Sequence, residues 1–353
     1  MTTESTTESS RPVLAITLGD PVGIGPEITA QVLAEPAATR TARPLAVGDP
    51  ASLRRAIEVC RLDLRVNPIG AVAQARFEPG VVDVLDVGVP TADLPWGTVD
   101  GTAGRAAVAA IEMATRAALR GEADAVVTAP INKEAIWAAG SKHLGHTEML
   151  GELTGSSRFN TMFWVRGLKI FFATRHLSLR EALDRITEPN IEHAIREAYV
   201  ALRVFGTAAP RLAVAALNPH GGENGKFGDE EITAIAPAVR TAQADGLDVT
   251  GPVPADSVFH QGLQGRYDGV LSLYHDQGHI ASKTVDFAGT VSVTVGLPIL
   301  RTSVDHGTAF DIAGTGKADA GTMRAAFAAA VELAPFASRL RETYPPDTVT
   351  QRS

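Results

Sequence analysis

The chain has 353 residues, of which 45% are apolar but only 5% aromatic, enough for one large or two medium domains with cores of small aliphatic residues. A net charge of −8 argues against a nucleic-acid or anionic-membrane partner, although a few local cations would suffice for an anionic substrate. A single cysteine, Cys60, excludes an intrachain disulfide. With no apolar stretch of transmembrane length and no secretory signal, we expect a cytoplasmic protein.

Strand-like apolar runs alternate with helical patterns, an order typical of parallel βαβ units. The predicted strands are 13–18, 44–47, 81–85, 125–128, 161–165, 169–173, 212–216, 269–273 and 291–295. The predicted helices are 27–33, 51–60, 103–119, 189–205, 230–244 and 319–333. Gly167 is placed to close a short hairpin. Residues 1–10 and 345–353 are polar and expected to be disordered.

Three histidines each close a predicted strand and lie in a dense polar motif. They are His176, His220 and His275. Ligands in α/β proteins gather at the carboxyl ends of strands, so three imidazoles there could hold one divalent metal and leave positions open for a substrate. Zinc suits such a set, with magnesium, manganese and cobalt as alternatives.

Two glycine-rich segments resemble nucleotide-binding loops incompletely. Residues 19–27 follow the first strand and open the first helix, but Ile28 stands where a dinucleotide fingerprint needs its third glycine. Glycines there also fit a simple tight turn. Residues 314–317 lack the first glycine and the final Ser or Thr of a P-loop, so an ATPase is disfavoured. No cofactor-binding residue can be assigned.

His275 and His279 have the spacing of a zinc-protease helix. Gly278 is a poor helix residue, and His275 follows an apolar strand with little room for a helical turn. We therefore interpret His275 as a ligand candidate and His279 as its neighbour. If a helix begins near Asp276, Lys283 projects on the same side as His279.

A phosphate clamp is the second candidate site. His146 and Thr147 open a predicted helix, whose N–H groups favour an anion, while Lys283 and Arg301 supply charge. Taken singly, each cation also fits a solvated surface residue.

With these residues assembled, the chain resembles the 4-hydroxythreonine-4-phosphate dehydrogenase family of vitamin B6 biosynthesis, which includes relatives acting on 4-phosphoerythronate or 4-phosphothreonate. The matching segments are 19–27, 128–134, 145–148, 218–223, 274–278 and 296–309. The resemblance implies two α/β domains with a cleft between them, similar to isocitrate and isopropylmalate dehydrogenases. We expect residues 11–135 and 290–340 to form the first domain and 136–289 the second.

The resemblance also implies a homodimer with the site at its interface, and it assigns residues. Metal ligands fall on His176, His220 and His275, and substrate contacts on His146, Thr147, Lys283, Ser292 and Arg301. The vitamin B6 enzymes have asparagine where Ser292 stands and Gly-Leu-Pro where this chain has Gly278-His-Ile.

The implied reaction is metal-dependent oxidation of a small phosphorylated hydroxy acid by NAD or NADP, followed by decarboxylation. Lys283 and His275 are the candidate catalytic residues, and Lys283 could move a proton or bind phosphate. We expect 4-phosphohydroxy-L-threonine, giving 3-amino-2-oxopropyl phosphate, as substrate. The alternatives are 4-phospho-D-erythronate or 4-phospho-D-threonate, and a metal-dependent hydrolase without a nicotinamide.

Overall fold

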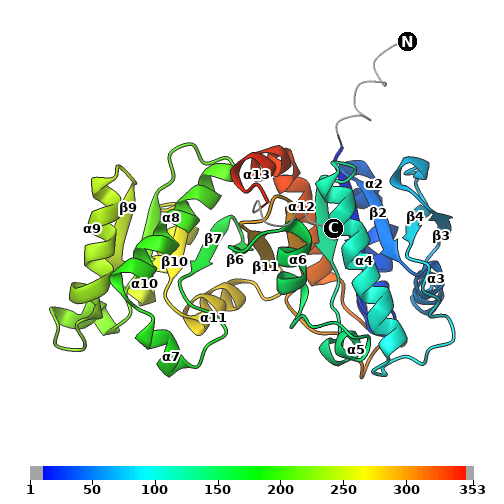
Figure 1. The fold of residues 1–353 in the computed structure, drawn as a ribbon, viewed down its shortest axis with the longest axis horizontal. Coiled ribbons are helices and arrows are strands. Elements are labelled where there is room, and N and C mark those ends of the chain that lie inside the picture. Colours follow the sequence, from blue (N-terminus) through cyan, green and yellow to red (C-terminus); the bar gives the residue numbers. More distant parts are fainter. Residues whose placement is uncertain (1–10, 347–353) are drawn as a thin grey trace, which may run out of the picture. The chain divides into compact units, whose positions relative to one another are not determined.

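The structure is a computed structural model that describes residues 11–346, so most of the predicted disorder at the two ends lies outside the described residues. The chain divides into two compact units. Unit 1 runs to Phe159 and resumes at Leu297, and unit 2 spans Asn160–Gly296. Figure 1 labels many of the helices and strands of both units.

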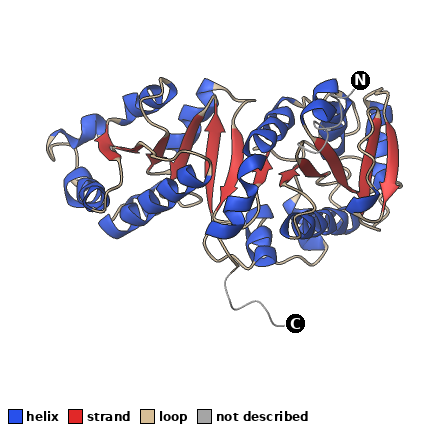
Figure 2. Ribbon diagram, turned by 90° about the horizontal axis from the view of Figure 1, so that it is seen from above, coloured by secondary structure: helices blue, strands red, loops and turns tan. Residues whose placement is uncertain are grey.

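Unit 1 is built on a parallel sheet with the strand order β3-β4-β2-β1-β5-β12. The strands are β1 (Val13–Thr17), β2 (Arg43–Gly48), β3 (Arg65–Ile69), β4 (Val81–Asp86), β5 (Ala125–Thr128) and β12 (Arg301–Ser303). The helices are α1 (Gly25–Ala34), α2 (Pro36–Thr41), α3 (Pro50–Val59), α4 (Gly101–Leu119), α5 (Lys133–Ala138), α6 (His146–Thr154), α12 (Gly321–Leu333) and α13 (Ala337–Thr343), with short 3₁₀ turns η2 (Val72–Gln74) and η5 (Ala334–Phe336). Figure 2 shows helices on both faces of this sheet.

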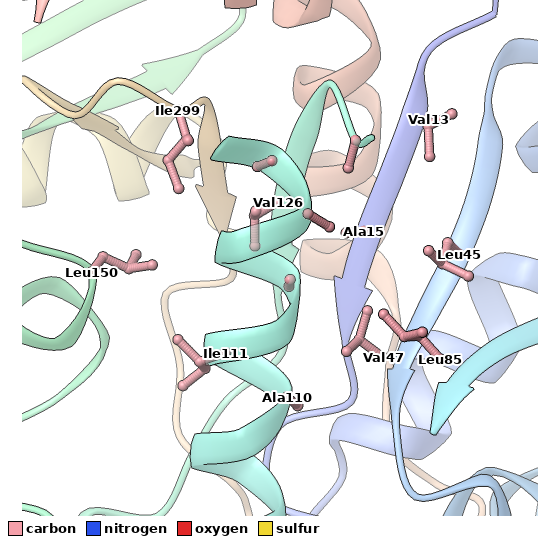
Figure 3. Close-up of a cluster of buried hydrophobic side chains, with 14 of the residues drawn as sticks. Val13, Ala15, Leu45, Val47, Leu85, Ala110, Ile111, Val126, Leu150 and Ile299 are labelled. Carbon is pink, nitrogen blue, oxygen red and sulfur yellow. The ribbon is translucent and has the colours of Figure 1, made fainter. Parts of the chain in front are cut away.

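The core of unit 1 lies between the sheet and α4. Strand residues such as Ala15, Val47 and Val126 face Ala110 and Ile111 of the helix (Figure 3). All five are at most 1% exposed. The small side chains of α4 let backbones approach closely, since a Cβ on Gly104 would lie only 2.0 Å from the Ala135 carbonyl oxygen of α5.

Unit 2 has the strand order β11-β6-β7-β10-β8-β9, antiparallel at the β11-β6-β7 end and parallel from β7 onwards. The strands are β6 (Asn160–Val165), β7 (Leu168–Phe172), β8 (Leu212–Ala215), β9 (Val249–Val253), β10 (Gly269–Ser272) and β11 (Val291–Val295). The helices are α7 (Leu179–Asp184), α8 (Glu188–Val204), α9 (Ala236–Ala244), α10 (Ala255–Leu263) and α11 (His275–Val285), with the 3₁₀ turn η3 (Pro219–Glu223) and the π-helix η4 (Glu231–Ile235).

Most predicted elements are present, including the β6–β7 hairpin, whose turn residues Arg166 and Gly167 both have positive φ. Three strands were missed. β3 is polar and partly exposed, β9 contains Gly251 and Pro252, and β12 has only three residues, so none shows a clear apolar pattern. The helix predicted at 230–244 begins instead with the π-helix η4.

The unit boundaries follow packing rather than sequence signals. Helices α5 and α6 pack on α4, which keeps them in unit 1, although the predicted boundary lay at residue 135. Strand β11 pairs antiparallel with β6, which places it in unit 2 although the prediction gave residue 290 onwards to the first domain. Within residues 11–346, no helix combines the length and apolar character needed to cross a membrane.

Candidate functional site

Strands β7, β10 and β8 are neighbours in unit 2 and run parallel, so their carboxyl ends meet at one sheet edge. Each leads into one of the three predicted metal ligands. His176 follows β7, His275 follows β10 as the first residue of α11, and His220 follows β8 in the turn η3. All three histidines therefore lie just beyond the ends of these strands, as the sequence predicted.

Side-chain hydrogen bonds hold these strand ends together. The hydroxyl of Thr174 donates to the Leu273 carbonyl over 2.8 Å, which ties the end of β7 to that of β10. Gln277 ties β10 to β8, because its Oε1 accepts the Leu273 N–H at 2.7 Å and its Nε2 donates to the Ala216 carbonyl at 2.8 Å. The backbones that carry the three histidines are thus fixed by groups that the sequence analysis did not single out.

His176 and His275 line one pocket in unit 2. Their ring centroids are 6.3 Å apart, and the pocket has a volume of about 310 Å³. Arg175 and Asp276 supply charge at its wall, and the remaining lining residues are Leu177, Leu179, Ala182 and Tyr274. A pocket with two imidazoles and an apolar wall suits a small organic ligand.

Asp276 orients the ring of His275. A carboxylate only accepts, so the Nδ1 of His275 donates to the Asp276 Oδ1 over 2.6 Å. This fixes the tautomer with Nε2 as the lone-pair nitrogen, which is how carboxylates prepare metal-binding histidines.

His279 is a neighbour of His275 rather than a second arm of a zinc helix. The expectation of too little room for a helical turn was wrong, because α11 begins at His275 itself. The two rings stack at 3.6 Å, and the Nδ1 of His279 donates to the His275 carbonyl. Gly278 allows this packing, since a Cβ there would lie 2.5 Å from the ring of Phe172.

The third predicted ligand, His220, is exposed and has a left-handed backbone with φ of 54°. Among the described residues, no three His, Cys, Asp or Glu side chains are arranged to hold a metal ion. The donor chemistry fits a borderline metal, and two of the three imidazoles are neighbours, so the complete ligand set stays a prediction.

Lys283 and Ser292 lie on elements of the same unit. Lys283 is on α11, two helical turns beyond His275, with its Nζ 5.3 Å from the centre of the Phe287 ring. Ser292 is 9% exposed on β11 and lies opposite Phe163 of β6, whose ring contacts His279 at 4.4 Å. Ser292 and His279 lie at the two places where the chain departs from the vitamin B6 pattern, and both therefore have Phe163 as a neighbour.

Unit 1 carries the other predicted substrate contacts. Helix α6 begins at His146, as expected, and no side chain caps its N-terminus. Arg301 of β12 is 5% exposed, and its Nε and Nη2 donate to the Thr128 hydroxyl at 3.1 and 2.8 Å. It is a buried cation and not the solvated surface charge considered as an alternative.

Burial dominates the electrostatics of these two groups. Desolvation, with a smaller effect from the Arg301 charge, holds the pKa of His146 well below its usual value, and the His146 Nε2 is buried without a hydrogen-bond partner. Desolvation also lowers the pKa of Arg301 to about 10, opposed by Asp305. At neutral pH, His146 is therefore a neutral ring beside a guanidinium that keeps its charge.

The glycine-rich segments serve packing. The N–H groups of residues 20, 22, 23 and 24 already have partners, and a Cβ on Gly19 would lie 2.2 Å from the Pro130 carbonyl oxygen. The N–H groups of Gly314 and Gly316 donate to the buried carboxylate of Glu27 at 2.6 and 2.9 Å. The described N–H groups of both segments are thus used in internal hydrogen bonds, and residues 19–27 form a tight strand-to-helix turn.

Asp20 is a strongly perturbed acid among the described residues of unit 1. Its side chain is fully buried, its Oδ1 accepts the Val22 N–H at 3.0 Å, and its Oδ2 has no partner. Desolvation raises its pKa to about 6, against the Val22 hydrogen bond and with help from Asp100. Sequence analysis missed this group because nothing in the turn motif shows that the carboxyl points inward.

Comparisons with known proteins agree with one another. Residues 40–330 match the family described as pyridoxal phosphate biosynthetic protein PdxA. The chain is 59% identical to a Cutibacterium acnes protein named "Putative D-threonate 4-phosphate dehydrogenase", over 96% of this chain and 98% of that protein. It is 51% identical to a Symbiobacterium thermophilum protein of the same name, over 94% and 99%. The crystal structure of 4-hydroxythreonine-4-phosphate dehydrogenase from Klebsiella pneumoniae superposes with a TM-score of 0.86 at 44% identity, covering 92% of this chain and 98% of that one.

Proposed function

The chain belongs to the PdxA family and is a dehydrogenase with an α/β fold like that of isocitrate and isopropylmalate dehydrogenases, and from this premise we propose that it oxidises a small phosphorylated hydroxy acid with NAD or NADP and one divalent metal. The observation that carries the proposal is the paired placement of His176 and His275 at one pocket. The hydrolase alternative loses its support, because the matching relatives are named dehydrogenases.

We place D-threonate 4-phosphate first among the substrates and 4-phosphohydroxythreonine second, which reverses the order expected from sequence. The relatives with that first name are the more similar in sequence, at 46% to 59% against 44% for the Klebsiella enzyme. Ser292 supports the change, because its hydroxyl is shorter than an asparagine amide and suits a substrate with a hydroxyl rather than an amine beside the carboxylate.

We assign the roles of the side chains from the family resemblance, supported by their positions at the strand ends. His176, His220 and His275 would hold the metal, with Asp276 fixing the ring of His275. When bound, the metal supplies Lewis acidity at the substrate hydroxyl and the nicotinamide accepts the hydride. Lys283 is the side chain in unit 2 assigned to move the hydroxyl proton or to neutralise the phosphate.

The reaction balances as oxidation followed by carbon–carbon cleavage. Oxidation would take a hydride from C3 of the substrate to the nicotinamide and the proton of the C3 hydroxyl to a base, which would give a β-keto acid. Its carboxylate leaves as carbon dioxide, and the resulting enolate takes up a proton. D-Threonate 4-phosphate would yield dihydroxyacetone phosphate, whereas 4-phosphohydroxythreonine would yield 3-amino-2-oxopropyl phosphate.

The phosphate contacts proposed are His146, Thr147, Lys283 and Arg301. Charge-assisted hydrogen bonds contribute roughly 1.5–3 kcal/mol each, so Arg301→Lys should lower kcat/KM by about one to two powers of ten on phosphorylated substrates. Equal losses on the unphosphorylated acid would contradict the phosphate role. A homodimer, implied by the family, completes the proposal and is tested by light scattering.

The substrate is tested by a panel of 4-phospho-D-threonate, 4-phospho-D-erythronate and 4-phosphohydroxythreonine with NAD or NADP and excess metal. We expect reduced cofactor and dihydroxyacetone phosphate to form together from 4-phospho-D-threonate. A markedly higher kcat/KM on 4-phosphohydroxythreonine would restore the original order of substrates. His220→Ala should lose both metal and turnover, and full metal occupancy in that variant would overturn the ligand assignment.

A further inference from the structure

We propose that Glu231 is a positioning residue whose buried carboxylate shapes the turn carrying His220 and thereby sets the affinity for the divalent metal. The inference rests on the proposed function, in which His220 is a metal ligand. It adds a residue that touches neither metal nor substrate but determines where one ligand stands.

The carboxylate of Glu231 binds the backbone just beyond the end of β8. Its side chain is 3% exposed, and its Oε1 accepts the backbone N–H groups of Leu217 at 2.8 Å and Asn218 at 2.7 Å. Its Oε2 accepts from the Asn218 side-chain amide at 2.9 Å. Three donors from two residues thus converge on one buried anion, two positions before His220.

The turn that follows has a backbone that L-residues avoid. Residues 220–224 all have positive φ, including the non-glycine residues His220 at 54°, Glu223 at 46° and Asn224 at 54°. A left-handed conformation is unfavourable for each non-glycine residue, because its Cβ lies too close to the backbone. Tertiary contacts must therefore hold this turn in place.

The turn also wraps around the carboxylate. A Cβ on Gly222 would lie 2.8 Å from the Glu231 Oε2 and 2.9 Å from the Gly228 carbonyl oxygen. The Phe227 N–H donates to the Gly222 carbonyl at 3.1 Å, which closes the loop over the carboxylate. Glu231 is thus enclosed by the segment that it organises.

Glu231 opens the π-helix η4, in which the Ala236 N–H bonds to the Glu231 carbonyl. Such turns are rare and are found frequently at functional sites. Glu230 accepts from the same Asn218 amide at 2.6 Å but has no contact with the backbone donors. The backbone contacts distinguish Glu231 as the anchor.

Glu231→Gln is the substitution that tests this inference most directly. Glutamine keeps the volume but places an NH₂ group against a donor, so at least one of the three hydrogen bonds becomes a repulsion between donors. Loss of an outer partner of a metal ligand typically costs 10- to 100-fold in metal affinity. We expect the same range here. The kcat at saturating metal should stay within about threefold of wild type, because Glu231 has no substrate contact.

Calorimetric titration of Zn²⁺ into chelator-treated protein measures the effect directly, with wild type, His220→Ala, Glu231→Gln and Asp229→Asn compared. Asp229 is exposed in the same segment and undergoes the same charge change, so its variant should bind within about threefold of wild type. Thermal unfolding of each variant reports folding separately from metal affinity.

The outcomes separate the two ideas. A 10- to 100-fold loss in Glu231→Gln, with activity restored by excess metal, supports the inference. Wild-type affinity in Glu231→Gln beside a large loss in His220→Ala overturns the inference alone. Unchanged affinity in His220→Ala overturns the proposed ligand set and this inference with it. If Glu231→Gln does not fold, Asn218→Ala decides, because it removes the side-chain amide that donates to Glu231 and Glu230 and leaves both backbone donors to Glu231 in place. It should weaken binding about threefold or more, and unchanged binding overturns the inference.

Discussion

The strand ends of the two units use polar groups in opposite ways. In unit 1, Arg301 and Ser303 bond to the hydroxyl of Thr128, and all three side chains are buried. In unit 2, the buried Thr174 and the half-buried Gln277 bond to backbone, and the exposed His176 and half-buried His275 stand beyond them. At these strand ends, the polar side chains of unit 1 bond to one another, whereas in unit 2 the groups that bond to backbone are separate from the more exposed histidines.

This difference between the units predicts which property a substitution should change, stability in unit 1 and metal affinity in unit 2. Changes to buried polar groups of unit 1 should alter the free energy of unfolding without altering metal affinity. Changes to the supporting groups of unit 2 should lower metal affinity as well as stability, because those groups fix the backbones of the proposed ligands.

Glu27→Ala should give the largest effect and should fall on stability alone. It removes the carboxylate that accepts hydrogen bonds from the Gly314 and Gly316 N–H groups, each worth roughly 1.5–3 kcal/mol, so we expect about 3–6 kcal/mol of destabilisation. Urea unfolding measures it, with the exposed Glu58→Gln as control. A large change in the Zn²⁺ affinity of the folded variant would contradict the expectation that this buried group of unit 1 affects stability alone.

Asp20→Asn should stabilise unit 1, with a pH dependence of known sign. The folded pKa of about 6 lies above the ordinary value of 3.8, so the folded state binds more protons between these values and wild-type stability gains as pH falls through that window. Asparagine does not titrate. The variant should be more stable by about 3 kcal/mol well above pH 6.

Stability curves of both proteins at pH 8 and pH 4 measure the Asp20 effect. Most of the variant's advantage should be lost near pH 4, where the Asp20 carboxyl is protonated in the folded state and close to half protonated in the unfolded state. An advantage of equal size at both pH values would show that burial of the Asp20 charge is not its origin.

Sequence predicted the histidine-bearing strand ends because each motif joins an apolar run to a polar cluster within a few residues. It also predicted the start of α6 at His146 and the hairpin at Gly167. These signals are local, and local patterns survive into the fold whenever the segment is buried on one side.

The supporting groups could not be read in the same way. Glu27 meets the loop at Gly314 and Gly316 across 287 and 289 residues of sequence, and no periodicity records that contact. Glu231 was hidden within an expected helix, although the run Pro219–Glu223 with its two glycines signalled a turn that needs an anchor. Sequence motifs therefore indicate the exposed histidines, whereas the buried groups that hold these histidines in position are visible only in the packed structure.

Gln277→Leu tests the support between β10 and β8. It removes both hydrogen bonds, to the Leu273 N–H and the Ala216 carbonyl, and should cost about 1–3 kcal/mol of stability. Because the backbones of His275 and His220 are then free to shift, Zn²⁺ affinity should fall about tenfold. Gln277→Glu keeps the acceptor and loses the donor, so it should show an intermediate affinity. Unchanged affinity in Gln277→Leu would show that this support does not reach the ligands.

Thr174→Val should give the smallest effect, since it removes one neutral hydrogen bond, from the buried hydroxyl to the Leu273 carbonyl, at nearly constant volume. We expect about 1 kcal/mol of destabilisation, with a twofold to fivefold loss of Zn²⁺ affinity because His176 lies two residues beyond. Thr174→Ser keeps the hydroxyl and should retain wild-type affinity while losing only the packing of a methyl group. If both variants bound Zn²⁺ like wild type, the β7 end would be held by the sheet ladder alone, and the separation of supporting from displayed groups would apply only to His220 and His275.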